Sequence, residues 1–552
     1  MASTFSIVPR VVLAALLCVS AVAFGASQHS PGASALPPPA PAPLARTTVG
    51  TAARCQTALA ADCGAARKSG SAACLVCAGQ HQHDLRAARC SNAVIGEYCR
   101  SGDGAAAPGT KFAVGFNNAN CEAHPHAGVQ LADGGWLMVG DSVCWDGSTP
   151  AVQRMVFVVV SDSDGKQRWS TRLGDIGFNY GKAGTQLQDG TVVVGGAKSV
   201  VDPDAQRAGY AYIEVRALWR LDVNTGEVLS ENLYPNDGKM TGLRDGVMCV
   251  NPTTDGTNGL VATGYVGGEA NYDKKTNQYD DEPMFLIFNG VAFGARLTFS
   301  SDLAAPPDVE FEVKLGLDES YGYVPMQGMR VHMDTSGSVA TSAAACSGPY
   351  DDAWDMQFSL LSLNAETGEL QWAKRYVTGL ASHPYGLALS APGDATPGYV
   401  IAGHSMEDGR QPIGRLLKAR ASDGAVVWDR SFTDRDERYY NIECYGVDAT
   451  LDGGYIVTCG DGPMDIPAWM KKDCHEQAWT AFVYRADQSG QPLWTANVTD
   501  STAKCVSDAG EHIVTARGGG YAVYVDSGTL GQPGTGGNFG LVVLDSDTSK
   551  AL

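Results

Sequence analysis

Positive charge is scarce in this sequence. The chain of 552 residues has 40 Lys and Arg against 60 Asp and Glu, a formal net charge of −20, and no basic run occurs anywhere. A protein that binds nucleic acid needs a basic surface to contact the phosphate backbone. The composition therefore argues against nucleic acid as a partner, whereas the acidic excess favours solubility and attracts cations.

Motifs of several common enzyme families are also missing. The sequence contains no Gly-Lys-Ser/Thr phosphate loop, no His-Glu-x-x-His zinc helix and no Gly-x-Ser-x-Gly nucleophile elbow. Catalytic residues can be assembled from distant segments without leaving a contiguous motif. These absences therefore exclude the named families rather than catalysis itself.

Long apolar runs are absent except near the start of the chain. Arg10 precedes the apolar run from Val11 to Phe24, and the small residues Ala23 and Gly25 are placed for cleavage. The run is too short to span a bilayer. This order of features predicts a signal peptide over residues 1–25, no transmembrane segment in the mature chain, and a secreted, extracytoplasmic or lumenal protein.

Two short regions follow the predicted signal. Residues 26–50 are rich in Pro and Ala, which favours an extended linker. Residues 51–100 favour helix and carry six cysteines, which predicts a small helical disulfide module with fifteen possible pairings. The six are Cys55, Cys63, Cys74, Cys77, Cys90 and Cys99.

A zinc site is the alternative for this module. Cys74 and Cys77, followed by His81 and His83, offer four ligands at close spacing. An oxidising compartment converts evenly numbered cysteines in a short segment into disulfides. Export therefore favours the disulfide interpretation.

The rest of the chain, residues 101–552, is a series of repeats. A glycine recurs seven times, and each copy opens an apolar segment that runs to a turn and then to a second apolar segment. After the first glycine, residues 129–131 lead into an Asp-Gly-Gly turn, and residues 136–140 return as a strand. The repeated glycines are Gly128, Gly184, Gly246, Gly328, Gly386, Gly446 and Gly510.

Each repeat continues with a third strand, a tight turn and a fourth strand. The clearest copies end on Trp169, Trp372, Trp428 and Trp494, while the second copy has Ser230 at the Trp position. The third copy, at residues 285–288, is degenerate. Seven repeats of four antiparallel strands predict an all-β, seven-bladed β-propeller.

The ends of the repeat region predict how the ring closes. The seventh repeat stops after its third strand, residues 541–544, while residues 111–114 form a strand with no repeat of their own. Phe112 precedes Gly128 by the same interval at which Trp494 precedes Gly510. An N-terminal strand is therefore expected to complete the last blade and to remove an exposed sheet edge.

The segments with Asp, a turn, Gly, three residues and Trp resemble the tryptophan-docking repeats of quinoprotein-like propellers. This superfamily includes pyrroloquinoline quinone dehydrogenases, and the resemblance covers most of residues 111–552. It implies that the Gly makes the turn and that the Trp packs between blades. The alcohol dehydrogenases of the family are commonly eight-bladed and carry an adjacent cysteine pair, which this sequence lacks.

The connections alternate between the two ends of the strands. Short Asp-Gly turns are expected on one face and long, variable connections on the other, where propellers usually bind ligands. Cysteines fall mostly in or near the long connections, which favours four disulfides, with Cys121–Cys144 and Cys474–Cys505 the preferred pairs. The eight cysteines of the repeats are Cys121, Cys144, Cys249, Cys346, Cys444, Cys459, Cys474 and Cys505.

Residues just before the repeated glycines are expected to ring the mouth of the central channel. They are polar, and they could bind a small ligand, hold a divalent cation or supply an acid and a base. Water filling the channel is the simpler explanation of the same polarity. The candidates are His124, His126, Tyr180, Lys182, Arg244, Asp245, Gln327, His383, Tyr385, Glu443, Tyr445 and Asp508.

Several other residues have simpler explanations. His332 and His512 lie in apolar strands and are expected to be structural, whereas His404 and His475 are secondary candidates in long connections. Asp162 and Asp164 belong to a recurring turn rather than a calcium loop. The acidic insertion at residues 269–282 is interpreted as a solvated excursion. Asn497 starts the single glycosylation sequon.

The sequence favours a secreted binding protein over an enzyme. Its expected ligand is an extracellular glycan, a small polar molecule or another protein, bound through the face with the long connections. The alternative is an extracellular oxidoreductase or hydrolase that uses a quinone or a divalent metal at the channel mouth. A rigid structural spacer is the third hypothesis.

Overall fold

The computed structural model divides the chain into two compact units. One comprises Met1–Gly104 with Asp351–Ala353, and the other Ala105–Tyr350 with Trp354–Leu552. The predicted signal peptide and linker lie outside the described residues. The structure describes residues 58–59, 61–63, 77, 81, 108–116, 121–144, 153–203, 212–234, 244–268, 272–273, 278–279, 291–315, 321–324, 330–334, 338–347, 357–391, 394–406, 412–432, 440–463, 479–499, 507–530 and 538–546.

The first unit is helical where it is described. Leu59 and Cys63 are fully buried, and Cys63 forms a disulfide with Cys77. This confirms a small helical disulfide module near the N-terminus. Because Cys77 is in a disulfide, it is not available as the zinc thiolate of the alternative interpretation. The cysteines that lie outside the described residues are Cys55, Cys74, Cys90 and Cys99.

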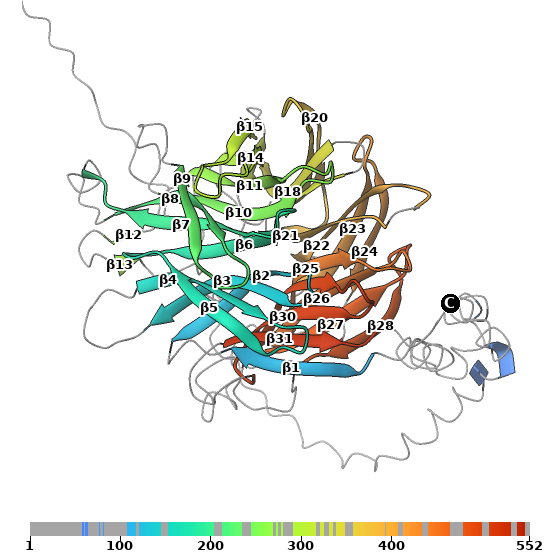
Figure 1. Ribbon diagram of the computed structural model, residues 1–552. Coiled ribbons are helices and arrows are strands. Elements are labelled where there is room, and N and C mark those ends of the chain that lie inside the picture. Colours follow the sequence, from blue (N-terminus) through green and yellow to red (C-terminus); the bar gives the residue numbers. More distant parts are fainter. Residues whose placement is uncertain are drawn as a thin grey trace, which may run out of the picture. The chain divides into compact units, whose positions relative to one another are not determined.

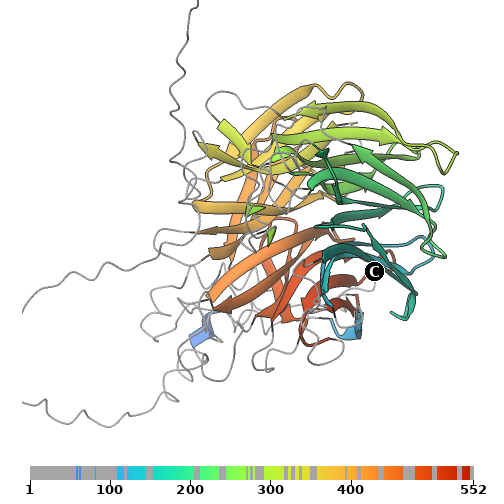
Figure 2. The ribbon, with the colours of Figure 1, turned by 90° about the vertical axis from the view of Figure 1, so that its left-hand side faces the viewer.

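The second unit is a seven-bladed β-propeller, as predicted. Figure 1 shows its sheets fanning out around a common centre, and Figure 2 shows the same arrangement from the side. In the first three blades the strands, from inside to outside, are β2 (Glu122–Gln130), β3 (Trp136–Cys144), β4 (Gln153–Ser161) and β5 (Gln167–Leu173); β6 (Tyr180–Gln186), β7 (Val192–Val200), β8 (Ile213–Leu221) and β9 (Val228–Tyr234); and β10 (Arg244–Pro252), β11 (Gly259–Gly268), β14 (Val291–Thr298) and β15 (Asp308–Lys314).

The remaining blades follow the same antiparallel order. Blade 4 has a divided inner edge, where β16 and β17 pair with different parts of β18. The strands are β16 (Tyr321–Val324), β17 (Val331–Met333), β18 (Ser338–Ser347), β19 (Gln357–Asn364) and β20 (Leu370–Tyr376); β21 (Leu380–Leu389), β22 (Gly398–Met406), β23 (Pro412–Arg420) and β24 (Val426–Phe432); β25 (Tyr440–Ala449), β26 (Tyr455–Pro463), β27 (Thr480–Ala486) and β28 (Pro492–Asn497); and β29 (Asp508–Thr515), β30 (Tyr521–Ser527), β31 (Asn538–Leu544) and β1 (Thr110–Phe116).

The third blade corrects one expectation. Its third strand is β14, at residues 291–298, and not the segment 285–288. The chain between β11 and β14 instead includes a two-stranded hairpin, β12 (Tyr272–Asp273) and β13 (Gln278–Tyr279). The acidic insertion moved the third strand further along the chain than the repeat interval suggested.

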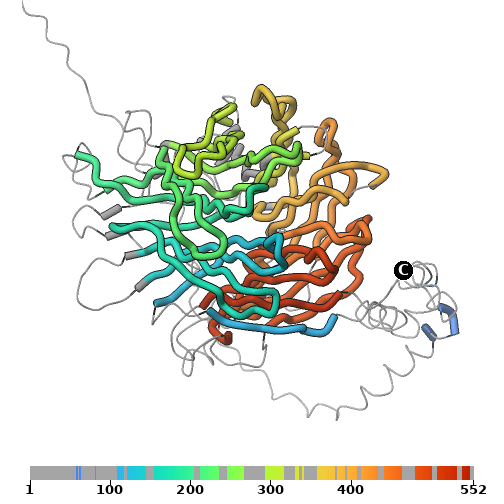
Figure 3. Tube along the Cα trace, in the orientation of Figure 1, coloured from blue at the N-terminus to red at the C-terminus, as the bar shows by residue number. Residues whose placement is uncertain are grey.

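The ring closes through its N-terminal strand, as predicted. β1 pairs antiparallel with β31, from Thr110 opposite Leu544 to Phe116 opposite Phe539. In Figure 3 this blue strand lies beside the red strands of the last blade. The last blade therefore contains both ends of the propeller sequence, and its third strand has a partner on each side.

The hydrophobic core lies between adjacent blades. One cluster joins Val139 and Val158 of the first blade to Val194 and Trp219 of the second, and all four are fully buried. Strands of a propeller bury both faces because each sheet packs against two neighbours, and this agrees with the continuous apolar runs of the second and third strands.

Aromatic residues at the fourth strands dock on the next blade. Trp428 of the fifth blade packs against Gly490 in a turn of the sixth, where an added Cβ would come within 2.9 Å of the indole, and its Nε1 donates to Gln488 O at 3.2 Å. Gly490 has a φ of 78°, which suits glycine. The same contact recurs for Phe112 on Gly165, Trp169 on Gly226, Phe311 on Gly368 and Trp372 on Gly424.

Buried cations brace the short turns. A basic residue on the third strand reaches the Asp of the turn between the first and second strands of its own blade. Arg485 and Lys418 are almost completely buried in these ion pairs. The pairs are Arg220–Asp189, Arg296–Asp255, Lys418–Asp394 and Arg485–Asp452.

Candidate functional site in the central channel

The inner strands start earlier than the six repeated glycines that the structure describes, which changes where the candidate residues lie. Gly128 is near the end of β2 and Gly446 is well inside β25, so the residues before them are inside strands rather than in a loop at the mouth. Gly386 and Gly446 are needed because adjacent inner strands approach closely there. An added Cβ at Gly446 would lie 3.0 Å from the His512 backbone of the next blade.

A β-bulge lies near most of these glycines. In β2 the partner register passes from Pro125 to Ala127, so His126 is the extra residue of the bulge. Extra residues of this kind leave the ladder and re-aim a side chain. The corresponding residues of five blades, called the inner-ring residues below, are His126, Lys182, Tyr385, Tyr445 and Glu511.

On the first two blades the inner ring is ionic and centres on Asp141 of β3, which is fully buried. His126 Nε2 lies 2.5 Å from Asp141 Oδ1, Arg154 Nη1 lies 3.1 Å from Oδ2, and Lys182 Nζ lies 3.8 Å from Oδ1. Burial alone would raise the pKa of Asp141, but these surrounding cations hold it far below its usual range. Glu511 adds a second carboxylate, 3.7 Å from His126 Nδ1.

On the fifth and sixth blades the inner ring is aromatic. The rings of Tyr385 and Tyr445 meet edge to face with centroids 4.9 Å apart, and the Tyr445 hydroxyl donates to the Glu443 carboxylate. His404 Nε2 lies 3.1 Å from His383 Nδ1. Burial lowers the pKa of His383 to about 4 and raises the pKa of Glu443. Burial therefore favours the neutral form of both groups.

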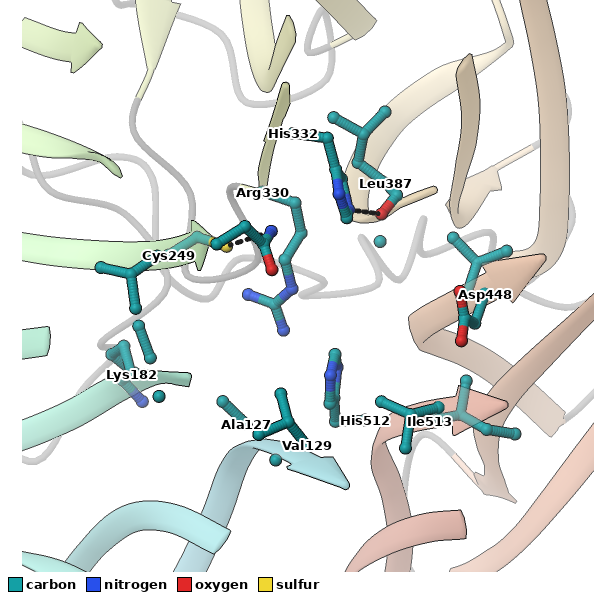
Figure 4. A pocket seen from close by; sticks show the side chains of 18 residues that line it. Ala127, Val129, Lys182, Cys249, Arg330, His332, Leu387, Asp448, His512 and Ile513 are labelled. Atoms are coloured by element: carbon teal, nitrogen blue, oxygen red, sulfur yellow. Dashed lines mark hydrogen bonds between the residues drawn. The ribbon is translucent and has the colours of Figure 1, made fainter. Parts of the chain in front are cut away.

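A cavity of about 200 Å³ occupies the channel next to this ring. Its lining comes mostly from the part of each inner strand that follows the bulge, so it lies on the side of the short turns and not at the long connections. Figure 4 shows the Arg330 guanidinium extending toward its middle and the His512 ring on the opposite side. The polar and titratable side chains of the lining are Lys182, Cys249, Asn251, Arg330, His332, Asp448 and His512.

Burial sets the charges of this cavity. It lowers the pKa of His332 to about 4 and of His512 to about 3, and His332 Nε2 donates to Leu387 O at 2.7 Å. Burial also raises the pKa of Asp448 to about 6 and lowers that of Lys182 to about 8. At neutral pH the lining therefore carries two cations, one carboxylate and two neutral imidazoles.

Other predicted candidates are not among the inner-ring residues. His124 contacts Asp526 at 2.6 Å and Glu122 at 3.1 Å. Asp508 accepts hydrogen bonds from Ser527 and Thr529, so it fixes a turn. Asp245 is buried in β10, and only the backbone of Arg244 is described, opposite Gly268.

Gln327 lies outside the described residues, as does His475. Six predicted candidates fall into two groups of contacts: His126 and Lys182 meet at Asp141, and the other four, His383, Tyr385, Glu443 and Tyr445, contact one another in sequence.

Sequence reasoning missed several channel residues. Glu511, His512 and Arg330 follow the repeated glycines of their repeats instead of preceding them, and Asp141 comes from a second strand. His332 and His512 lie in strands as predicted, but they line the cavity. His404 lies in β22 rather than in a connection. A search on both sides of each glycine would have found the first three.

The cysteines form a different pattern from the predicted four disulfides. Cys444 and Cys459 face each other across β25 and β26 and form a disulfide with a Cα–Cα distance of 3.9 Å. Cys249 is a buried free thiol, because its place on β10 turns it toward the channel. Cys121 is disulfide-bonded. The side chains of Cys144, Cys346, Cys474 and Cys505 lie outside the described residues.

Other predicted features agree with their simpler interpretations. Asp162 Oδ1 accepts backbone N–H bonds from Asp164 and Lys166, so these residues form a turn. Asn497 is exposed at the end of β28. Within the described ranges, no group of three or more His, Cys, Asp or Glu is arranged to hold a metal ion.

A search of the described residues for a helix long and apolar enough to cross a membrane found none.

No protein-family model and no curated protein matches this chain. Solved structures similar to it include BamB from Moraxella catarrhalis (11% identity, 79% of this chain and 99% of that one, TM-score 0.32) and a quinohemoprotein alcohol dehydrogenase from Pseudomonas putida HK5 (11%, 80% and 77%, 0.38). An α-L-arabinanase from Penicillium chrysogenum is also similar (10%, 66% and 92%, 0.37). At these identities the likeness concerns the fold alone.

Proposed function

We propose that this protein is an exported binding protein that holds a small organic anion in the central cavity of its propeller. The observation that carries the proposal is the Arg330 guanidinium, which extends into a cavity of about 200 Å³ beside Lys182. A buried guanidinium is complemented best by a carboxylate or another oxyanion. The neutral imidazoles of His332 and His512 add hydrogen-bonding groups without adding charge.

The size of the cavity limits the ligand. A cavity of about 150 Å³ accommodates benzene, so 200 Å³ suits a molecule of roughly six to ten non-hydrogen atoms. A tricyclic quinone with several carboxylates is larger than this, so the cavity does not fit the quinone cofactor that the fold family suggests. A glycan longer than one sugar unit is too large for the same reason.

The proposed location rests on the predicted export signal and on the disulfides. Cys63–Cys77 and Cys444–Cys459 would persist in an oxidising compartment and would be reduced in a cytosol.

The central cavity supports a small molecule over an extracellular protein as the ligand, because a protein partner would contact an outer surface instead.

The test is a thermal-shift and calorimetric screen of the full chain against small carboxylates, sulfonates, phosphates and neutral sugars. A ligand at 100 times its Kd stabilises the fold by about 2.7 kcal/mol. We expect Arg330→Gln to bind a hit at least about tenfold more weakly, since a hydrogen bond to a charged group contributes roughly 1.5–3 kcal/mol.

The matched control is Arg420→Gln, because Arg420 is half exposed and pairs only loosely with Asp423 at 3.1 Å. Equal weakening by both substitutions, or a preference for neutral sugars, would reject the anion site. Native mass spectrometry of protein from its source would reveal a retained ligand. A retained metal or quinone would instead support the oxidoreductase or hydrolase alternative.

A further inference from the structure

The amine of Lys182 has features that are not needed to neutralise the charge of Asp141. Its Nζ is buried and makes no hydrogen bond in the described structure, and its side chain lines the central cavity. Buried ammonium groups ordinarily satisfy their hydrogen bonds, since an unmet one costs free energy. An amine held in this state on a cavity wall is arranged to meet something that enters the cavity.

The carboxylate beside Lys182 is already well neutralised. Asp141 is contacted by His126 at 2.5 Å and by Arg154 at 3.1 Å, whereas Lys182 Nζ stays at 3.8 Å, beyond ordinary hydrogen-bonding distance. Asp141 therefore does not need the lysine as its main partner. It instead keeps the amine at a defined place between the first and second blades.

The surroundings also favour the nucleophilic form of the amine. Burial lowers the pKa of Lys182 to about 8 against the attraction of Asp141, and the charges of Arg154 and Arg330 lower it further. Roughly one lysine in ten is then a free amine at pH 7, against fewer than one in a thousand for an exposed lysine. Desolvation and neighbouring cations are the two known ways of activating a lysine nucleophile.

We propose that Lys182 condenses with the carbonyl group of a small 2-oxo acid to form an imine, while Arg330 binds the carboxylate of that acid. The proposal deepens the proposed function, because it names the class of anion and requires the same cavity. A 2-oxo acid of six to ten non-hydrogen atoms matches the cavity volume of about 200 Å³.

The chemistry needs no oxidant or reductant. The lone pair of the Lys182 amine forms a bond to the carbonyl carbon, and the carbonyl oxygen takes up a proton to give a carbinolamine. The nitrogen then loses its remaining proton as the C–O bond breaks, so that one water leaves and a C=N bond forms. His512 lines the same cavity, and its neutral imidazole is a group available to move these protons.

The test traps the imine by reduction. The full chain is incubated at pH 7.5 with pyruvate or 2-oxoglutarate and sodium cyanoborohydride, and the intact mass and the modified peptide are measured. We expect one adduct per chain, on Lys182, formed on the order of 10- to 100-fold faster than on exposed lysines because more of its amine is unprotonated. Labelling spread evenly over many lysines, or absent at Lys182, would overturn the proposal.

Matched variants separate the roles of the two cations. Lys182→Arg keeps a cation near Asp141 but cannot form an imine, so this variant should fold and should not form the adduct. The control is Lys166→Met, in an exposed turn, which should be labelled at Lys182 like the wild type. Arg330→Gln should slow labelling by both reagents, because loss of this charge raises the pKa of Lys182, but it should slow labelling by 2-oxo acids more than by propanal, which has no carboxylate. Equal slowing with both reagents would remove the role assigned to Arg330.

The same experiment distinguishes this proposal from the one on which it rests. Thermal stabilisation by 2-oxo acids without an adduct would reject the imine and leave the anion site standing. If neither stabilisation nor an adduct is observed with 2-oxo acids, the imine proposal fails, while the anion site fails only if the wider screen of anions also finds no ligand. A melting curve for each variant shows that the comparison is made between folded proteins.

Discussion

The blade interfaces and the inner ring are built from the same repeat, yet they use it in opposite ways. At the interfaces one contact is copied from blade to blade, as where Trp372 packs on Gly424 and Trp428 packs on Gly490. In the inner ring the residue at the bulge changes around the ring, from His126 and Lys182 to a pair of tyrosines and Glu511. Copied positions hold the ring together, and positions that differ are free to make one asymmetric site at its centre.

The largest expected effect breaks a blade interface. Trp428→Ala should lower the free energy of unfolding by about 3–5 kcal/mol, because it removes a buried indole and leaves a cavity beside Gly490. Chemical denaturation measures this. Binding in the central cavity should be unchanged below the unfolding transition if the two regions are independent.

The matched control is Leu370→Ala, on the outer strand of the fourth blade, where the side chain is 51% exposed. Its effect should stay within about 0.5 kcal/mol. A comparable loss from both substitutions would show that the docked Trp is not what joins the blades.

Low pH should lower the free energy of unfolding through titratable groups at the centre of the ring rather than through the blade interfaces. His332 has a pKa of about 4 when folded and about 6.5 when unfolded, so below pH 6.5 the unfolded chain binds more protons. Stability should therefore fall as the pH drops from 6.5 to 4, by up to about 3 kcal/mol for this residue. Asp448, with its raised pKa, opposes this trend between about pH 6 and 4 and makes the net loss smaller.

His332→Gln isolates this effect, because Gln keeps an N–H donor for Leu387 O and does not titrate. The difference in unfolding free energy between pH 7.5 and 4.5 should be smaller in the variant than in the wild type. Identical pH slopes would show that His332 is not held in its neutral form.

A smaller effect is expected where inner strands approach each other. Gly446→Ala would place a Cβ 3.0 Å from the His512 backbone, and the forced shift should cost about 1–3 kcal/mol. Gly518→Ala is the control, because its Cβ would meet nothing within 4 Å. If both variants melt alike, close approach is not the reason for the repeated glycines.

The Gly446→Ala substitution also sharpens the comparison, since His512 lines the cavity. The variant should lose ligand affinity in addition to stability, whereas Trp428→Ala should lose only stability. A calorimetric titration of both variants with the same ligand measures this difference.

The interfaces could be predicted from the sequence, and the site could be predicted only in part. Turn glycines and the Trp that follows them are local signals, so they revealed the blades, their number and the role of Phe112 in closure. The inner ring depends on bulges, which redirect side chains without leaving a local signal. His126 and Lys182, which precede their glycines, were found, whereas Glu511 and Arg330, which follow theirs, and Asp141, which lies on a second strand, were not.

The free thiol of Cys249 is another feature that the sequence did not predict. An even number of cysteines in the repeats suggested that all of them pair, but pairing depends on where each side chain points. The ion pairs of Arg485 and Lys418 with their turn aspartates were missed as well, although the Asp-Gly turns themselves were recognised. Contacts between strands far apart in the sequence need the register, and the register comes from the folded sheet.

The pairing of β1 with β31 gives the propeller a particular folding order. Every blade except the last is made from consecutive segments, so it can form while later parts of the chain are still being synthesised. The last blade instead joins residues 110–116 to residues 538–544, which is a contact between the far ends of the ring. Contacts of such high sequence separation form late and slowly. The cavity needs residues of all seven blades, so it is complete only after this final step.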